Sequence, residues 1–534
     1  MSYTSLIFWA FVCACILLYF LFPKAHRWWV LLAASWFFYG YSSLKYCYYI
    51  LFTTVTTWGF ALLLDRMAEQ TKSEVKSHSE WGRPEKKAYK EKRKKLSGRM
   101  LLLYVILNIG ILVFLKYYTA AMGGINSLLG EAHALPVMKL ILPLGISFYT
   151  FQSVGYVIDV RNGLVRAEKN FAKVSLFVSF FPQIIQGPIS FYDQLAGQLY
   201  EGHDFDWNRF VSGAELILWG LFKKMLIADR AVNAVHSISD RYSEFNGTSL
   251  TFALLMYALQ LYVDFSAGID ISRGIAEIIG INMTENFHQP YFSTSINDYW
   301  RRWHISLGGW MKKYIFYPVA VLPVLTRASK SIGKSGFGKT RYGSNIAKTL
   351  AAAVGSLIVF IVVGIWHGSE ARYFFFGLYN GLIIMISVLF KPFFEDINRW
   401  LHIPSESKGM YLFRMIRTFI LVLIGYVFDI APNMAGVRAF FVRMLTDQNV
   451  HIFMQQKRAS VNLSMLDLQV ILFGTLVVLV SSVIQETRKV TIREMLKTRP
   501  VIRWIILTSA IALIVIFGVY GPNFDSVQFV YAQY

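Results

Sequence analysis

Runs of about 20 apolar residues recur along the whole chain and restrict its fold more than any other feature. A hydrocarbon core about 30 Å thick is crossed by about 20 residues of apolar α-helix. Backbone groups in lipid must be hydrogen-bonded within their own segment, so we expect helices rather than strands. The sequence therefore predicts an all-α, polytopic integral membrane protein. The candidate spans are residues 5–22, 29–45, 47–65, 100–117, 137–158, 171–189, 208–227, 250–266, 268–283, 349–366, 372–393, 413–431, 467–485 and 504–520.

The composition agrees with this fold class. Hydrophobic residues make up 55% of the 534 residues and charged residues only 16%, whereas a soluble protein carries about 25% charged residues. Lys and Arg outnumber Asp and Glu by 53 to 32. Such an excess can indicate nucleic-acid binding, but here the basic residues occupy short gaps between apolar runs, as the positive-inside rule describes. We therefore expect the lipid bilayer, and no nucleic acid, as the anionic partner.

The distribution of Lys and Arg predicts the topology. Residues 66–99 contain "KKAYKEKRKK" and are expected to form a basic cytoplasmic loop, whereas residues 118–138 contain no Lys or Arg and are expected outside. Counting spans from these two gaps places the N-terminus and the C-terminal tail, residues 521–534, on the extracytoplasmic side. The whole chain, residues 1–534, is expected to form a single membrane domain, in which the proline-broken segments between 171 and 320 line a cavity.

The stretch "NDYWRRWHISLGGW" places charged, histidine and tryptophan side chains in an oily chain. If the stretch is helical, Asp298 and Arg302 form an i,i+4 pair, and Arg301 and His304 are i,i+3 neighbours. Ionisable groups are costly in hydrocarbon and mark a functional site by default. An amphipathic helix at the membrane interface explains the same composition, so both interpretations stay open. The candidate site residues are Asn297, Asp298, Arg301, Arg302, Trp303 and His304.

A second polar cluster, "GIWHGSEARYFFFGLYNG", follows a long apolar run. It contains Trp366 and His367, and a neutral histidine is well suited to move protons near pH 7. Gly364 and Gly368 would allow another chain or a ligand to approach closely. The alternative is a structural histidine that caps a helix end. The three cysteines lie in apolar stretches without the spacing of a metal site, and no metal is expected.

The chain ends in "FVYAQY", residues 529–534, after a Gly-Pro turn. Aromatic side chains commonly anchor a segment at the membrane interface, and this explanation accounts for the composition on its own.

Longer motifs resemble the membrane-bound O-acyltransferase family, in its bacterial branch of alginate and peptidoglycan O-acetylation and teichoic-acid D-alanyl transfer. The resemblance covers residues 5–534, and it implies about 11–14 membrane helices, some short or re-entrant, around a transmembrane tunnel. The motifs are "LPLGISFYTFQSVGYVIDVRNG", "FFPQIIQGPI", "GLFKKMLIADR", "LQLYVDFSAGIDISRGIAEIIGI", "NFHQPYFSTSINDYWRRWHISLGGWMKKYIFYPV" and "WHG".

The resemblance also implies roles for residues. His367 matches the family's near-invariant catalytic histidine, and we expect it to be the general base that takes a proton from a hydroxyl. His304 matches the second motif position, and with Arg301 or Arg302 it is expected to donate to the developing oxyanion, or to position the donor. Asp298 would orient this group. Trp303 and Trp366, together with Asn297, would line the tunnel and exclude water.

The C-terminal tail also resembles a motif of the family, and the chain departs from some relatives at one position. Tyr531 matches a tyrosine that is thought to carry the acyl group as a relay in related systems. Some relatives have a histidine where this chain has Asn380, so any secondary role of a histidine at that position is absent here.

The implied activity is transfer of an acyl group, expected to be acetyl, from a cytoplasmic thioester to a cell-envelope or secreted polysaccharide. Acetyl-CoA or an acyl carrier thioester would be the donor, with no permanently bound cofactor. An extracytoplasmic SGNH or lipase-like acyltransferase is the expected partner, and the bacterial cytoplasmic membrane the expected location. The alternatives are D-alanyl transfer from a carrier protein to teichoic acid and, in another class, a transporter or flippase whose buried charges bind cargo.

Overall fold

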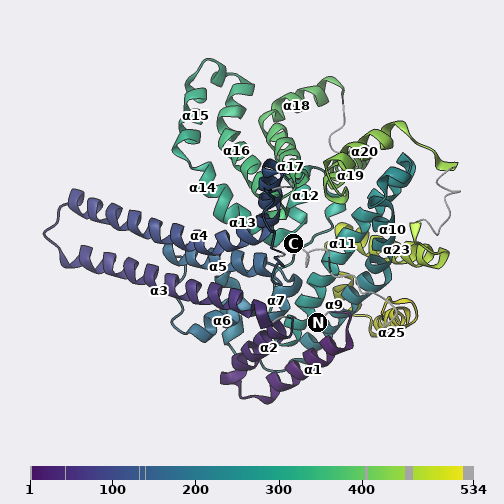
Figure 1. Ribbon diagram of the computed structural model, residues 1–534, viewed down its shortest axis with the longest axis horizontal. Helices are drawn as coiled ribbons and strands as arrows, with labels where there is room; N and C mark the ends of the chain where they lie inside the picture. Colours follow the sequence, from purple (N-terminus) through teal and green to yellow (C-terminus); the bar gives the residue numbers. More distant parts are fainter. Residues whose placement is uncertain are drawn as a thin grey trace. The chain divides into compact units, whose positions relative to one another are not determined.

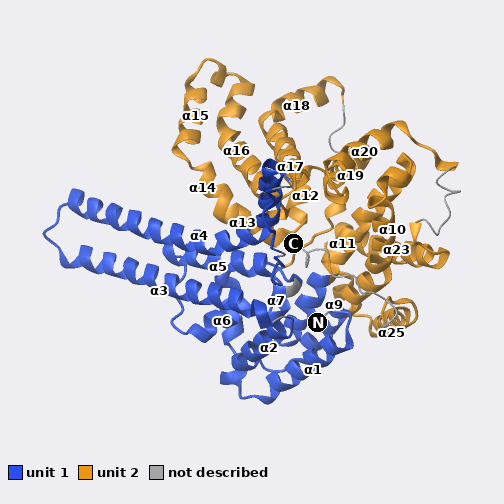
Figure 2. Ribbon diagram, in the orientation of Figure 1, with its two compact units in different colours: residues 1–217, 268–284, 531–534 blue, residues 218–267, 285–530 orange. Residues whose placement is uncertain are grey.

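The computed structural model describes residues 3–42, 44–130, 133–138, 140–402, 407–451, 461–520 and 529. Within these ranges the regular structure is helical, apart from one isolated antiparallel bridge between Phe287 and Trp303. The chain forms two compact units (Figure 2). Unit 1 comprises the described residues of 1–217 and 268–284, and unit 2 comprises those of 218–267 and 285–530.

Eight helices in the described residues are long and apolar enough to cross a membrane. They confirm the predicted all-α, polytopic membrane fold. Two shorter apolar helical segments, Leu6–Leu21 and Phe171–Ile184, accompany them, and the expected total of 11–14 membrane helices stays a prediction. The eight are α3 (Cys47–Ser77, preceded by a short turn from Leu44), α4 (Arg83–Leu129), α11 (Gly247–Ile278), α16 (Arg341–His367), α17 (Ala371–Leu389), α19 (Lys408–Ile430), α23 (Met465–Arg488) and α25 (Pro500–Phe517).

Two predicted spans of unit 1 are interrupted by proline and glycine. The predicted span 137–158 is helical only from Ile146, because Pro143 and Gly145 precede the helix and Gly145 has a φ of +67°. The predicted span 171–189 divides at Phe180, where Pro182 lies in the first turn of the next helix. The other helices of unit 1 are α1 (Leu6–Leu21), α2 (Arg27–Ser42), α5 (Ile146–Arg161), α6 (Phe171–Ser179), α7 (Phe181–Gln186), α8 (Tyr192–Tyr200) and most of α9 (Trp207–Phe222).

Residues 66–99, predicted as a loop, are largely helical. α3 continues to Ser77 and α4 begins at Arg83, so only a short turn separates them. The two helices lie side by side as a long hairpin (Figure 1), and the Arg93 guanidinium donates to Thr71 Oγ1 at 3.2 Å and to Gln70 Oε1 at 2.9 Å. At 1.5 Å per residue, the 47 residues of α4 measure about 70 Å, more than twice the thickness of a hydrocarbon core. Part of the hairpin therefore extends beyond the bilayer.

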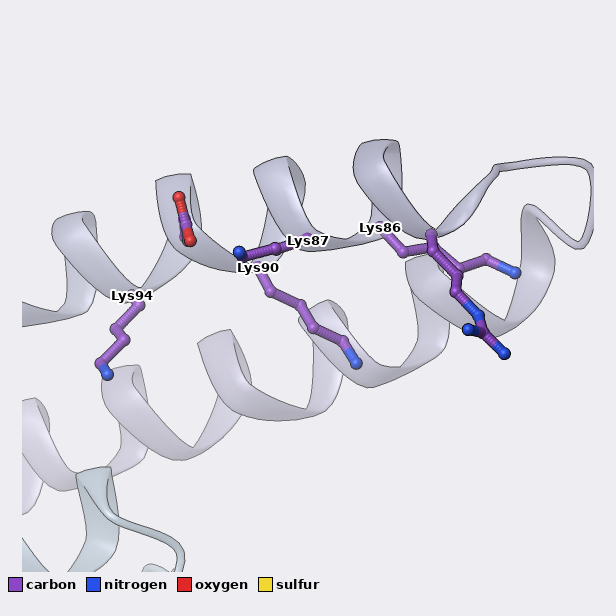
Figure 3. Close-up of a pocket in the computed structure, with 6 residues that line it drawn as sticks. Lys86, Lys87, Lys90 and Lys94 are labelled. Carbon is purple, nitrogen blue, oxygen red and sulfur yellow. The ribbon is translucent and has the colours of Figure 1, made fainter.

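The N-terminal end of α4 carries a basic face, which consists of Arg83, Lys86, Lys87, Lys90 and Lys94. Figure 3 shows the four lysines along the helix. Three of them, Lys87, Lys90 and Lys94, are exposed and Lys86 is half-buried. The face is a solvated surface and not an enclosed cavity.

One helix replaces two predicted spans. Residues 250–266 and 268–283 were expected to form separate spans, but α11 runs without a break from Gly247 to Ile278. A single glycine at position 268 does not end a helix in which no proline interrupts the hydrogen bonding.

Unit 2 combines long helices with short, broken segments. Its first residues include a π-helical turn, Lys223–Ala228, which leads into α10 (Asp229–Ser239). The remaining helices are α12 (Ile296–Arg302), α13 (Ile305–Met311), α14 (Tyr317–Ala320), α15 (Pro323–Lys334), α18 (Lys391–Trp400), α20 (Met434–Thr446) and α24 (Ile492–Leu496), with a second π-helical turn at Lys312–Phe316.

Candidate active site

His304 lies in a break between two short helices. α12 ends at Arg302, Trp303 is extended, and His304 has φ 47° and ψ 53°, in the left-handed region. The expectation of one continuous helix is therefore wrong, and Arg301 and His304 are not neighbours on a helical face. A left-handed conformation at a residue other than glycine is uncommon and costs roughly 1–3 kcal/mol. Such strain concentrates at functional sites, where the surrounding structure fixes it.

An upstream segment replaces the helical hydrogen bonds at this break. The His288 N–H donates to the Arg302 carbonyl at 2.9 Å, and the Ile305 N–H donates to the Asn286 carbonyl at 3.0 Å. These bonds flank the antiparallel bridge between Phe287 and Trp303. The backbone on both sides of His304 is thus paired with Asn286–His288 instead of with a preceding helical turn.

The side chain of Asn286 determines which imidazole nitrogen of His304 carries the proton. Its Oδ1 accepts the Ser306 N–H at 2.9 Å, which identifies this atom as the amide oxygen. The same oxygen lies 3.3 Å from His304 Nδ1. Because an amide oxygen can only accept, Nδ1 is the N–H donor of neutral His304, and Nε2 presents its lone pair.

The surroundings of His304 keep it neutral. The side chain is 2% exposed, and the ring of Phe265 packs edge-to-face against it with ring centroids 4.8 Å apart. Burial, together with repulsion from a charge on His367, lowers the pKa of His304 to about 3. His304 lies outside the eight candidate spans, and at neutral pH its imidazole is uncharged.

His367 is the last residue of the 27-residue helix α16. It is 9% exposed, and aromatic rings surround it: Tyr373 is stacked at 6.2 Å and Phe376 lies edge-on at 5.6 Å. The Arg372 guanidinium lies 4.3 Å from the Tyr373 ring centroid and donates to its hydroxyl at 2.8 Å. His367 therefore lies against a tyrosine whose own position is held from the neighbouring helix.

Glycines bring α17 close to the end of α16. A Cβ added at Gly364 would lie 2.3 Å from the Tyr373 carbonyl oxygen and 3.1 Å from Gly377 Cα. One added at Gly368 would lie 2.5 Å from the Tyr373 ring. The segment that approaches these glycines is α17 of the same chain, where another chain or a ligand was expected, as at small-residue helix contacts in membranes.

The structure brings the two histidines together across Trp366. The Trp366 ring centroid is 6.4 Å from that of His304 and 5.0 Å from that of His367, and Trp366 is 6% exposed. The electrostatic effect of His367 on His304 is a second sign of their proximity. Two imidazoles that are far apart in the sequence therefore meet at one buried indole.

The charged residues of the first cluster lie elsewhere. The predicted i,i+4 pair is present, with Arg302 Nε 3.2 Å from Asp298. Arg302 also pairs with Glu486 at 2.8 Å, and Lys489 lies 3.2 Å from Glu486. Arg302 is thus paired with two carboxylates, and Asp298 orients Arg302 instead of a histidine. The Arg301 side chain is exposed.

The remaining predicted residues differ in position. Trp303 is 2% exposed and packs against Phe287 at 5.0 Å and Tyr299 at 5.7 Å, so it is part of an aromatic cluster beside His304. Asn297 is exposed. Asn380 accepts a hydrogen bond from Trp300 Nε1 at 3.0 Å. Tyr531 lies outside the described residues, and the tunnel stays a prediction.

Two residues that hold the site in place, Asn286 and Glu486, were not predicted from the sequence. The role of Asn286 is not visible in its motif, because its contact with His304 spans 18 residues and depends on a tertiary pairing. Glu486 directly follows a predicted span, where a charge is not costly, and its pairing with Arg302 spans 184 residues.

The chain is similar to several known proteins. The family described as "MBOAT, membrane-bound O-acyltransferase family" matches residues 164–331. A protein of Pseudomonas syringae pv. tomato, named as a probable alginate O-acetylase, is 30% identical over 424 residues, which cover 78% of this chain and 70% of that protein. The peptidoglycan O-acetyltransferase of Helicobacter pylori is 27% identical, with 82% and 77% covered. The teichoic acid D-alanyltransferase of Bacillus subtilis is 28% identical, with 56% and 71% covered.

Proposed function

The chain belongs to the membrane-bound O-acyltransferase family, and from this premise we propose that it moves an acetyl group from a cytoplasmic thioester across the membrane to acylate a cell-envelope or secreted polysaccharide. The names of two relatives, an alginate O-acetylase and a peptidoglycan O-acetyltransferase, support an acetyl donor and a glycan acceptor. Acetyl-CoA is the proposed donor, and the bacterial cytoplasmic membrane is the proposed location.

The meeting of His304 and His367 at Trp366 carries this proposal. A hydroxyl is a poor nucleophile until a positioned base takes its proton, which contributes typically 10²–10⁴ in rate. His367 takes the hydroxyl proton while the oxygen forms a bond to the thioester carbonyl carbon. The C–S bond then breaks, and the thiolate receives that proton from the imidazolium of His367.

His304 has a different proposed role from the one expected from the sequence. With its proton on Nδ1, neutral His304 presents an acceptor at Nε2 and cannot donate from that atom to an oxyanion. We assign it to a positioning role beside Trp366, and the single proton of the attacking hydroxyl goes to His367. Arg302, paired with Asp298 and Glu486, is assigned to holding α12 and not to contacting the acyl group.

The aromatic surroundings protect the thioester. Trp303 and Trp366, each nearly fully buried, limit the water that reaches the reacting carbon, because water would hydrolyse the thioester without transfer. The indole of Trp366 also separates the imidazoles by a fixed distance. Positions fixed in this way lower the entropy lost in the reaction.

Tyr531 is proposed to carry the acyl group as a relay on the extracytoplasmic side. The predicted topology, which places the C-terminus outside, supports this role. An SGNH or lipase-like partner would complete the transfer from the tail to the polysaccharide.

Labelled acetyl-CoA tests the reaction. The purified protein should release free CoA and acquire label near its C-terminus. His367→Ala should abolish both, whereas His133→Ala, at an exposed histidine, should change neither. Normal labelling in His367→Ala would refute the assignment of the base, and label transport without CoA release would instead support the transporter alternative.

D-alanyl transfer is the second candidate, because a teichoic acid D-alanyltransferase is also similar to the chain. The same assay with a D-alanyl carrier-protein thioester separates the two donors. Tyr531→Phe should leave the fold intact but remove the hydroxyl that accepts the acyl group, so that label near the C-terminus and acylation of the glycan are both lost. Unchanged glycan acylation would exclude the relay.

A further inference from the structure

A second group of buried charges lies in unit 2, apart from the residues assigned to the reaction. Lys224 Nζ is 2.8 Å from Asp229 Oδ1 and 2.7 Å from Asp264 Oδ1, and each of the three side chains is at most 2% exposed. Buried charges are stable only when they are paired and hydrogen-bonded. Ionisable groups within a membrane protein are rare and mark function by default. We call these three residues the Lys224 cluster.

The backbone at the Lys224 cluster is unusual. Lys224 lies in the π-helical turn Lys223–Ala228, and π-helical turns are rare and frequent at functional sites. The neighbouring Lys223 is also buried and donates to Ser266 Oγ at 2.8 Å. Both lysines of the motif "GLFKKMLIADR" therefore point into the protein, where α11 supplies their partners.

The last residue of α25 and the described residues after it contact this turn or the residues that follow it. The Val519 N–H donates to the Met225 carbonyl at 3.1 Å, and the Arg230 guanidinium donates to the Phe517 carbonyl at 2.5 Å. Phe529, which is 3% exposed, places its ring centroid 4.1 Å from Lys224 Nζ. Phe517, Val519 and Phe529 thus all contact either the π-helical turn or Arg230, which lies just after it.

We propose that the Lys224 cluster is the docking site of the C-terminal tail, and that Lys224 is a positioning residue that holds the tail through the ring of Phe529. A desolvated ammonium group attracts the face of an aromatic ring, whereas an aliphatic side chain of similar size offers no such attraction. The two aspartates keep the ammonium charged and directed toward the ring. This inference rests on the proposed relay, because Tyr531 follows Phe529 by two residues in the sequence.

Substitution of Phe529 tests the docking without disturbing the buried charges. Lys224→Met would leave Asp229 and Asp264 without a counter-ion and could prevent folding, so Phe529→Leu is the decisive variant. Phe529→Tyr keeps the ring and is the matched control. The first measurement is the rate at which carboxypeptidase removes C-terminal residues from the purified, full-length protein, followed by mass spectrometry.

We expect Phe529→Leu to be digested roughly 10- to 30-fold faster than the wild type, in proportion to the lost attraction between ammonium and ring. Phe529→Tyr should be digested at the wild-type rate. Digestion of Phe529→Leu at the wild-type rate would overturn the docking site.

The second measurement is glycan acylation, which we expect to fall in Phe529→Leu together with the loss of protection and to be restored in Phe529→Tyr. Faster digestion with unchanged acylation would overturn the positioning role. His367→Ala separates this inference from the proposed function, because that variant should lose acyl transfer while its tail stays protected. An unprotected tail in His367→Ala would contradict a docking site formed by the Lys224 cluster alone.

Discussion

The two histidines of the candidate active site are held in contrasting ways. His367 ends a 27-residue apolar helix that packs on α17 through glycines. His304 occupies a left-handed residue between two seven-residue helices, and hydrogen bonds from Asn286–His288 hold the backbone on either side of it. The position of His367 thus follows from helix length and close packing, whereas that of His304 follows from a tertiary pairing. The local sequence therefore predicts the placement of His367, whereas the placement of His304 depends on its pairing with another segment.

The largest effect is expected at the two histidines of the candidate active site. His367→Ala should lower acyl transfer by about 10²–10⁴, and the double variant with His304→Ala should be no slower than His367→Ala, because His304 acts by positioning the site around that base. Single-turnover release of CoA measures this. Losses that multiply would show that the two residues act in separate steps.

Acidification should reveal the contribution of His304 to the stability of the fold. The pKa of His304 is lowered to about 3 in the folded protein, whereas in the unfolded chain it is about 6.5. The unfolded state therefore binds more protons between these values, so the folded state loses stability as pH falls below 6.5. From pH 6.5 to 5 the loss attributable to His304 is about 2 kcal/mol.

Thermal unfolding of the wild type and of His304→Gln, from pH 8 to pH 5, isolates this contribution. The stability difference between the two proteins should stay constant above pH 6.5 and shift against the wild type below it. Parallel curves over the whole range would show that His304 does not titrate in the unfolding reaction.

Glycine and alanine should rank in opposite order at the two sites. Glycine adopts the left-handed conformation of His304 without steric cost, so His304→Gly should be more stable than His304→Ala by about 1 kcal/mol. At the helical position of His367, glycine should be less stable than alanine by up to about 1 kcal/mol. Unfolding temperatures of the four purified variants measure the order, and the same order at both sites would contradict the local geometry described for His304.

The smallest effect is expected on the basic face of α4. Replacing Lys86, Lys87, Lys90 and Lys94 by Gln together should change the free energy of unfolding by less than about 0.5 kcal/mol per site, because exposed charges contribute little. The labelling activity with acetyl-CoA should also be unchanged. A large loss of stability would show that the face is packed against another segment.

Much of the fold could be predicted from hydropathy. The runs that became α16, α17, α19, α23 and α25 were found within several residues of their observed bounds, because a 20-residue apolar run has few alternatives to a spanning helix. The helical hairpin of residues 66–99 was missed, because a highly charged helix leaves no apolar signal. Pro143 and Pro182 interrupted two predicted spans, and residues 250–266 and 268–283, predicted as two spans, form the single helix α11.

The candidate site was predicted in part. The motif containing His304 and the position of His367 were visible in the sequence, and so was the pair of Asp298 and Arg302. The break at Trp303 and His304 was not visible, because it depends on a bridge to Phe287 that propensity cannot show. The proton position on His304 depends in turn on Asn286. The roles of Tyr531 and of the tunnel stay predictions.

The glycine contact between α16 and α17 has a mechanical consequence. Backbone lies directly on backbone at Gly364 and Gly377, and close-packed interiors of this kind are stiff and yield little under load. The imidazole of His367 should therefore keep its place as substrates enter and leave. We expect any rearrangement that admits substrates to occur in the segment of His304. Three hydrogen bonds hold the backbone of this segment, and they can break one at a time.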